Sequence, residues 1–217
     1  MKKTYLEMVN NILIRLRERE VTTITQSAYS KLIGVLVRDA IELVESAWNW
    51  SALRTSININ TVAGTFNYVL TDAGDKSTIL SIINANTKQY VEYQTQEWFN
   101  QQYLMNGARS GSPTHYTFNS TDDNGNTQVD LWPKPNAIET LHVNLVQRSP
   151  DIAGDATKVN VPYIPVQTLA YAMALEERGE DGGMSAVSAK ALAHNYLSDA
   201  IAIDAGKHPE ELIWEAP

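Results

Sequence analysis

The chain has 217 residues, of which 43% are hydrophobic and 19% charged, and its formal net charge at pH 7 is −8. This composition is too apolar for a disordered chain, and no apolar run reaches the about 20 residues that a membrane-spanning helix needs. Cysteine is absent and only four histidines occur, which excludes disulfide frameworks, thiol catalysis and cysteine-based zinc or iron–sulfur sites.

The negative charge lies mainly toward the C-terminal end of the sequence. Residues 151–217 carry eleven acidic and four basic side chains, whereas residues 1–54 carry six acidic and eight basic ones. Proteins that hold nucleic acid gather lysine and arginine into patches that neutralise phosphates. We therefore expect no tight binding of DNA or RNA.

Two amphipathic helices are predicted in the first 54 residues. Thr4 and Glu7 have the spacing of a capping box, and apolar residues at helical spacing continue from there to about Arg19. A second apolar stripe begins near Ser27 and runs without proline to Trp50. Each helix should bury one face.

The hydrophobic period changes from 3.6 to 2 at Thr55, which predicts strands. Strands are expected at 57–59, 66–70, 78–87, 90–93, 129–131 and 141–145, with one short helix at 95–104. Glycine, proline and asparagine turn signals separate these runs. Together they predict a small antiparallel β-sandwich or barrel.

The helical period returns after Pro162. It predicts one helix before a glycine-rich loop at 179–183, and another from Met184 to Pro209 whose apolar stripe begins with Met184 and Val187. Ten alanines fall within these two helices, which indicates that the helices approach each other closely.

The order of the elements predicts an α+β protein with two domains. Residues 1–54 and 151–217 should form one four-helix bundle from two N-terminal and two C-terminal helices. Residues 55–150 should form an inserted antiparallel β domain that carries the one short helix.

The acidic run that begins at Asp122 invites comparison with a calcium-binding loop. Position 12 of such a loop, counted from Asp122, is Pro133, where a bidentate glutamate would be required. The dipeptide Asn124-Gly125 instead predicts a type I′ hairpin turn. No metal site is expected.

The sequence offers no catalytic constellation. Ser188, His194 and Asp199 fall within one predicted helix, but their spacing spreads them around it, and no G-x-S-x-G elbow is present. The adjacent pair Glu176-Glu177 is typical of a solvated helix end, and no phosphate-cradling glycine loop occurs. We expect no catalytic residue, no cofactor and no enzymatic activity.

Four segments share the order and character of one protein family. They are the second helix at 32–50, the charged stretch Arg15–Val21 that ends the first helix, the segment Leu131-Trp132-Pro133, and Pro162-Tyr163-Ile164-Pro165 ahead of an alanine-rich helix with Glu176-Glu177-Arg178-Gly179. Through these segments the chain resembles, over most of its length, the tailed-phage head–tail adaptors of the tail tubular protein A family, which are podovirus-type connector proteins.

The resemblance implies a structural virion protein that is made in the host cytoplasm and lies at the head–tail junction. It implies a homo-oligomeric ring, usually a dodecamer, that docks on the portal protein and attaches the tail nozzle protein and possibly tail fibres. DNA would pass through the lumen without specific binding, and nothing would insert into a membrane. The family brings no catalytic residue with it.

Two other classes of protein remain open. One is a virion-associated hydrolase or glycan-binding tail protein whose β module acts on the host envelope. The other is a helical interaction domain unrelated to phages. A large ring, alone or with portal, would distinguish the adaptor from both.

The last eight residues are the candidate partner interface. Leu212, Ile213 and Trp214 place three large apolar side chains in the short acidic segment 210–217, and such side chains are a liability in water. Trp214 either folds back on its own helices or anchors the segment on a neighbouring subunit or on the portal. Tryptophan is enriched among the residues that dominate interface energies, and the resemblance favours the second alternative.

Overall fold

The computed structural model describes residues 2–71, 73–74, 77–107, 109–179 and 184–207. The protein is a mixed α+β chain that divides into two compact units. The helical unit consists of residues 1–52 and 149–217, and the sheet unit consists of residues 53–148. Each unit is described below by itself.

The helical unit contains four long helices. They are α1 (Tyr5–Arg15), α2 (Ala28–Ala47), α4 (Tyr163–Arg178) and α5 (Met184–Ala205), with short 3₁₀ helices η1 (Ile24–Gln26) before α2 and η2 (Ser51–Leu53) after it. The predicted capping box of α1 is confirmed, because the Glu7 N–H donates to Thr4 Oγ1 at 3.2 Å and the Thr4 N–H donates to Glu7 Oε2 at 2.8 Å. The helix ends before the expected Arg19 because Arg17 adopts a left-handed φ of 60°.

Helix α2 begins and ends with recognisable local signals. Ser27 caps it by accepting a hydrogen bond from the Ser30 N–H at 2.9 Å. The helix stops at Ala47, three residues before the expected Trp50, because Trp48 is already extended. The Trp50 indole N–H turns back to the carbonyl of Val44 at 2.7 Å, and this ring is almost fully buried.

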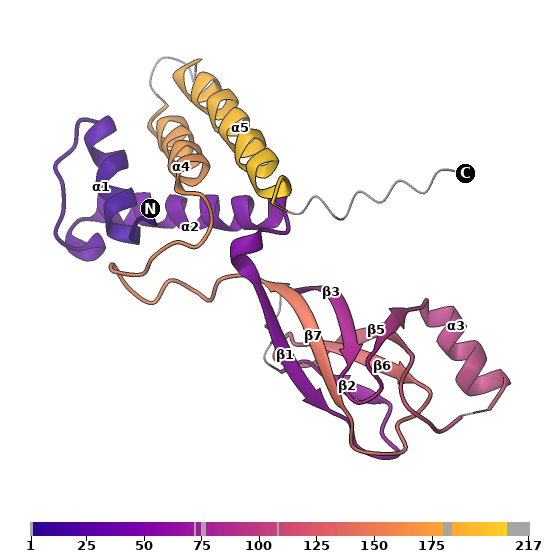
Figure 1. The fold of residues 1–217 in the computed structure, drawn as a ribbon. Coiled ribbons are helices and arrows are strands. Elements are labelled where there is room, and N and C mark those ends of the chain that lie inside the picture. Colours follow the sequence, from indigo (N-terminus) through magenta and orange to yellow (C-terminus); the bar gives the residue numbers. More distant parts are fainter. Residues whose placement is uncertain (1, 72, 75–76, 108, 180–183, 208–217) are drawn as a thin grey trace, which may run out of the picture. The chain divides into compact units, whose positions relative to one another are not determined.

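The four helices do not align as the predicted four-helix bundle. Figure 1 shows α4 lying beside α5, while α2 runs across this pair and α1 packs against α2 and α4. The close crossing of α1 over α2 depends on Gly34, where an added Cβ would lie 2.7 Å from the Tyr5 hydroxyl oxygen and 2.9 Å from Ile24 Cγ2. The absence of a side chain at Gly34 therefore allows α1 and α2 to approach closely at this point.

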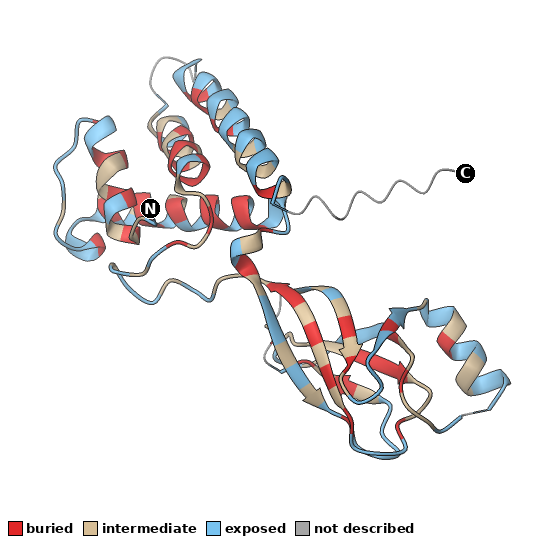
Figure 2. Cartoon of the chain, in the orientation of Figure 1, coloured by how far each residue is buried: buried red, intermediate tan, exposed pale blue. Residues whose placement is uncertain are grey.

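All four helices contribute to the core of the helical unit. Buried apolar side chains of the four helices include Met8, Val9, Ile12 and Leu13 of α1, Ile33, Val37, Ala40 and Val44 of α2, Val166, Ala170, Ala172 and Ala174 of α4, and Ala186, Ala189 and Ala193 of α5. Figure 2 shows buried segments in red on all four helices, fewest on α5. Alanine on both α4 and α5 explains why these two helices approach so closely, as the alanine count predicted.

The sheet unit is built on one curled seven-stranded sheet. Its strands are β1 (Arg54–Asn60), β2 (Asn67–Val69), β3 (Ser77–Asn84), β4 (Gln89–Tyr93), β5 (His115–Thr121), β6 (Thr127–Trp132) and β7 (Thr140–Gln147), in the spatial order β1-β7-β3-β4-β5-β6-β2. Strand β5 was not predicted.

The predicted antiparallel sandwich or barrel is wrong in one respect that decides the topology. Strands β4 and β5 pair in parallel, through Glu92 with His115 and Tyr93 with Tyr116, so the sheet is mixed. A parallel pair needs a crossover connection. Helix α3 (Gln96–Asn100) and the π-helical turn η3 (Gln101–Met105) supply it, and they occupy the place of the predicted short helix.

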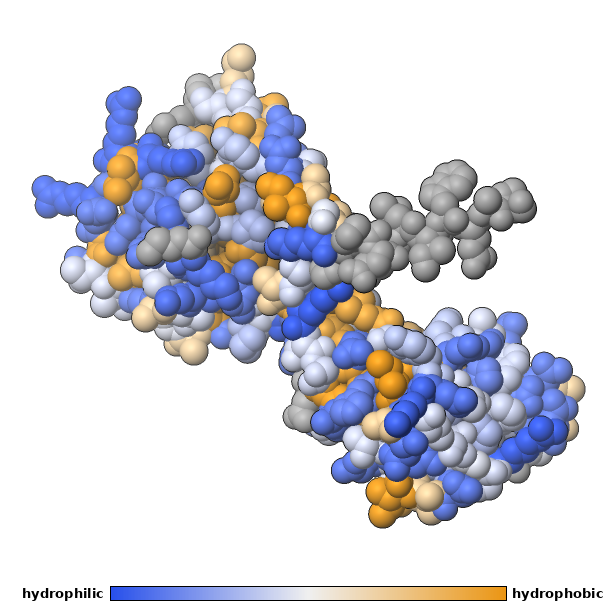
Figure 3. All heavy atoms as spheres, viewed as in Figure 1, coloured by the Kyte–Doolittle hydropathy of each residue, from blue (hydrophilic) through white to orange (hydrophobic). Residues whose placement is uncertain are grey.

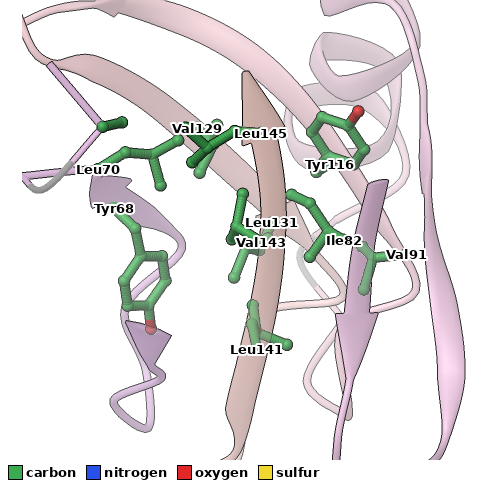
Figure 4. Close-up of a cluster of buried hydrophobic side chains, with 11 residues drawn as sticks. Tyr68, Leu70, Ile82, Val91, Tyr116, Val129, Leu131, Leu141, Val143 and Leu145 are labelled. Carbon is green, nitrogen blue, oxygen red and sulfur yellow. The ribbon is translucent and has the colours of Figure 1, made fainter. Parts of the chain in front are cut away.

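One hydrophobic cluster holds the sheet unit together, and Figure 4 shows its side chains. Leu141, Val143 and Leu145 of β7 point into it, and His142 and Asn144 are only partly buried. The alternation predicted at 141–145 is therefore confirmed. The other members are Tyr68, Leu70, Ala73, Ile82, Val91, Tyr116, Val129 and Leu131.

The loop between β5 and β6 is a hairpin of a different type from the one predicted. The Gly125 N–H donates to the Asp122 carbonyl at 2.9 Å, and Gly125 alone has a positive φ, 83°. This is a type I turn followed by a left-handed glycine rather than a type I′ turn. The Asn126 side chain and the backbone N–H groups of Asn126 and Asn124 bind the Asp122 carboxylate and lower its pKa.

Candidate protein–protein interfaces

Helix α5 is apolar on more sides than its own core requires. Ala186, Ala189 and Ala193 form its buried face, which packs on α4. Around the rest of the helix, and not on a single stripe, five large side chains are exposed, by 38 to 76% of their surface. They are Met184, Val187, Leu192, Tyr196 and Ile203, and we call them the α5 outer face. Figure 3 shows hydrophobic side chains at the surface in the region of α5.

The α5 outer face carries almost no charge. Among the charged residues of the helix, Lys190 pairs with Glu176 of α4 at 2.6 Å and Asp204 is buried, which leaves Asp199 exposed. A surface helix of a monomeric protein normally has a charged outer side, and a helix that is apolar all round is normally buried. The α5 outer face is therefore a candidate contact with another protein surface.

The C-terminal end of α5 is fixed in place by Asp204. Its carboxylate accepts hydrogen bonds from the backbone N–H and hydroxyl of Ser51 and from Lys207 Nζ, at 2.8, 2.6 and 2.9 Å. Burial alone would raise the pKa of Asp204, but these hydrogen bonds lower it to about 2. The helix is thus held rigidly to the segment that follows α2, which suits a docking surface.

A groove between α1 and α4 is a second candidate. It has a volume of about 440 Å³ and is lined mainly by Lys3, Ile14 and Arg15 on one side and Tyr163, Ile164 and Gln167 on the other. Lys3 Nζ lies 4.7 Å from the centre of the Tyr163 ring. Within the part of the chain that the structure describes, no acidic side chain lines this groove, although the protein as a whole is acidic.

The sheet unit presents a small apolar tip formed by Val62 and Ile138, which are exposed by 56% and 74%. Buried polar groups hold the two loops that carry them. The Thr61 N–H donates to the Glu139 carbonyl at 2.8 Å, and the Glu139 N–H donates to Thr61 Oγ1 at 2.8 Å. The Glu139 carboxylate accepts hydrogen bonds from Asn84 and from Ser112. We call this pair of exposed side chains the sheet tip.

The structure does not place the predicted interface residues Leu212, Ile213 and Trp214, which lie outside the described residues. Ser188, His194 and Asp199 are all exposed on α5, and no hydrogen bond joins them.

Among the described residues no group of three or more histidines or carboxylates could hold a metal ion. Within the same residues, none of the helices has the length and apolar character needed to span a bilayer.

The sequence contained a signal for one of these surfaces. The apolar stripe predicted for the last helix, which included Met184 and Val187, is not its buried face, because the structure buries Ala186, Ala189 and Ala193 and leaves Met184 and Val187 exposed. The groove had no local signal, because Lys3 and Tyr163 meet only through the packing of α1 on α4. The sheet tip likewise depends on pairing between segments 78 residues apart.

One family model matches the chain, that of the SU10 adaptor protein, over residues 3–209. No curated protein matches it. The match spans both units and confirms the coarser expectation, a phage adaptor protein of the virion, without bearing on the narrower likeness to tail tubular protein A. It ends one residue before segment 210–217. The chain belongs to the SU10 adaptor protein family.

Proposed function

We propose that the protein is a non-enzymatic head–tail adaptor that forms a homo-oligomeric ring at the head–tail junction. The ring docks on the portal protein, continues the DNA channel and attaches the tail nozzle protein, in the manner of tail tubular protein A. The observation that carries this proposal is the largely apolar α5 outer face, with Asp199 as its one exposed carboxylate among the described residues, on a member of an adaptor family.

The α5 outer face is the lateral contact between ring neighbours. A helix of 22 residues extends about 33 Å, which is long enough for a continuous seam. A ring requires that one face of a subunit meet a different face of the next subunit, so that each contact repeats around the axis. The apolar side chains on the outer side of α2, Val35 and Leu43, are exposed by about half and form a second face of the same unit.

The sheet tip and segment 210–217 supply contacts with other virion proteins. Val62 and Ile138 lie on loops that a buried hydrogen-bond network around Glu139 holds in place. An uncharged pocket of the nozzle protein could therefore bind them without the entropy cost of ordering a mobile loop. Trp214 remains the predicted anchor on a neighbouring subunit or on the portal. Its deletion with segment 210–217 should leave the melting temperature unchanged and weaken docking.

The alternative of an envelope-acting hydrolase or glycan-binding protein gains no support from the buried carboxylates of the sheet unit. Glycosidases need two carboxylates that face each other across a cleft. Asp130 accepts a hydrogen bond from Asn67 at 2.7 Å, and Glu139 binds Asn84 and Ser112. Both carboxylates hold structure together rather than face solvent.

The test is the mass of the assembly, measured by light scattering and by electron microscopy of the protein alone and with portal. Ile203→Asp on the α5 outer face should abolish the ring, because it places a charge in the seam. The matched control is Leu104→Asp on η3, which alters an equally exposed side chain of the sheet unit. A wild-type protein that stays monomeric with portal present would refute the proposal.

A further inference from the structure

The groove between α1 and α4 combines positive charge with apolar walls. Ile14 and Ile164 are exposed by 53% and 44%, and they stand beside the basic groups of Lys3 and Arg15. The Arg15 guanidinium lies 5.6 Å from the centre of the Tyr171 ring. Both cations therefore lie over aromatic rings, which limits the freedom of their side chains.

Neither cation of the groove is neutralised. The described residues place no carboxylate within ion-pair distance of Lys3 or Arg15. Elsewhere in the helical unit, Lys190 has Glu176 and Lys207 has Asp204. Lys3 Nζ reaches only the amide oxygen of Gln167, at 3.5 Å. The groove therefore attracts an acidic ligand, and its isoleucines favour one that also carries large apolar side chains.

One segment of this chain has that composition. Residues 210–217 read Glu-Glu-Leu-Ile-Trp-Glu-Ala-Pro, with three carboxylates around three large apolar side chains. In the groove, the negative charges of the glutamates would complement the positive charges of Lys3 and Arg15, and the Trp214 ring would complement the aliphatic and aromatic walls. Opposite charges on the two surfaces, together with apolar groups on both, make the segment complementary to the groove.

By length alone, a segment from the same copy could reach the groove only when it is almost fully extended, whereas a neighbouring copy is not limited in this way. Tyr5, at the start of α1, touches α2 at Gly34, whereas Asp204 holds the end of α5 at Ser51, beyond the other end of α2. The rise of α2 from Gly34 to its end is about 20 Å. Trp214 and its apolar neighbours follow Lys207 by five to seven residues. A segment of that length spans at most about 25 Å when fully extended.

A segment from the same copy would also have to pass α4, which Figure 1 places between α1 and α5. It would use nearly all of its length in doing so. We propose that the α1–α4 groove binds the acidic C-terminal segment 210–217 of a neighbouring copy of this chain. The inference rests on the proposed ring, in which each copy would offer its groove to one neighbour and its segment to the other.

The experiment uses a fluorescein-labelled peptide with the sequence of residues 210–217 and a chain that ends at residue 209. Fluorescence anisotropy should show saturable binding of one peptide per chain. Arg15→Glu should weaken the binding at least tenfold, and so should replacement of the tryptophan in the peptide by alanine. Ile14→Ser is the second groove variant and covers the case in which Arg15→Glu fails to fold. Circular dichroism checks the fold of each variant.

Lys31→Glu is the charge-matched control, because Lys31 is exposed on α2 and does not line the groove. It should change the affinity by less than twofold. Absence of saturable binding, or equal loss with Lys31→Glu and Arg15→Glu, would overturn the inference. Weaker binding of the peptide to the dilute full-length chain than to the shortened chain would also overturn the inference. It would show that the segment occupies the groove of its own copy.

The mass of the shortened chain separates this inference from the proposed ring. A ring that forms while the peptide fails to bind overturns the groove assignment and leaves the adaptor proposal intact. Peptide binding to a full-length chain that never assembles supports the groove and overturns the ring.

Discussion

The carboxylate of Asp204, in the last turn of α5, accepts hydrogen bonds from both the backbone N–H and the hydroxyl of Ser51. Ser51 stands four residues after the end of α2, so this contact joins elements that are 153 residues apart in the sequence. It fixes the orientation of α5, and with it the α5 outer face, relative to α2. A rigid outer face loses less entropy on association than a mobile one.

Replacing Asp204 with alanine should lower the free energy of unfolding by about 2 kcal/mol at pH 7. The pKa of this group is about 2 in the folded protein, against an ordinary value of 3.8, and a shift of this size corresponds to about that energy. Because the folded pKa is depressed, the stabilisation is present above pH 4 and is lost as the pH falls toward 2. Denaturant unfolding at pH 7 and pH 3 measures both values.

The difference between wild type and the Asp204→Ala variant should fall to about half at pH 3. Asp199→Ala is the control, since this carboxylate is exposed on the same helix and should change stability little at either pH. An equal loss for Asp204→Ala at both pH values would show that the carboxylate acts by packing rather than by its charge.

Replacing Gly34 with alanine should destabilise the protein by about 1–3 kcal/mol, the usual cost of overpacking a core. In an isolated helix this change would stabilise by about 1 kcal/mol. Here the new methyl group would lie within 3 Å of Tyr5 and Ile24, and Tyr5 is buried and cannot move aside. Thermal unfolding measures the effect.

The double variant Gly34→Ala with Tyr5→Phe provides the control, since it removes the hydroxyl oxygen that stands nearest. It should recover part of the lost stability. A rise in melting temperature with Gly34→Ala alone would show that α1 does not pack against Gly34 of α2 as closely as described.

The sequence predicted those elements that are specified by neighbouring residues. The capping box at Thr4 and Glu7 is a contact between residues three apart, and it formed as expected. The burial of Leu141, Val143 and Leu145 follows from an alternation within five residues. In both cases the stabilising interaction or periodicity is visible in a short window, so a local pattern is sufficient.

Features that depend on residues distant in the sequence could not be predicted from local patterns. Strand β5 exposes most of its residues, from Phe118 to Thr121, so its alternation is weak and its pairing with β4 comes from the crossover through α3. The alignment of the helices was also beyond local patterns, because the helical period identifies a buried face but not the angle at which another helix crosses it. The α1–α4 groove exists only once these angles are set.

Replacing Glu139 with alanine should destabilise the sheet unit by about 2 kcal/mol or more. The carboxylate is buried and binds Asn84 and Ser112, so its removal leaves two polar groups without their partner. The loops that carry the sheet tip should loosen as well. Hydrogen exchange at Val62 and Ile138 should therefore rise in the variant, and thermal unfolding should report the loss of stability.

Glu92→Ala is the matched control for Glu139→Ala. The Glu92 side chain is 73% exposed, and its carboxylate lies 3.9 Å from His115. This change should be nearly neutral. Equal effects of the two variants would show that the network around Glu139 does not hold the loops.

The isolated protein should not bind duplex DNA measurably at physiological salt. A channel through which DNA passes must not retain it, and acidic walls repel phosphate. The chain carries 25 acidic and 17 basic side chains, and eleven of the acidic ones fall in residues 151–217, which include α4 and α5. Fluorescence anisotropy with a labelled duplex, titrated at low and at physiological salt, measures the affinity. Micromolar affinity that weakens steeply with added salt would contradict a lumen of this kind, because that dependence arises when lysine and arginine displace counterions from phosphates.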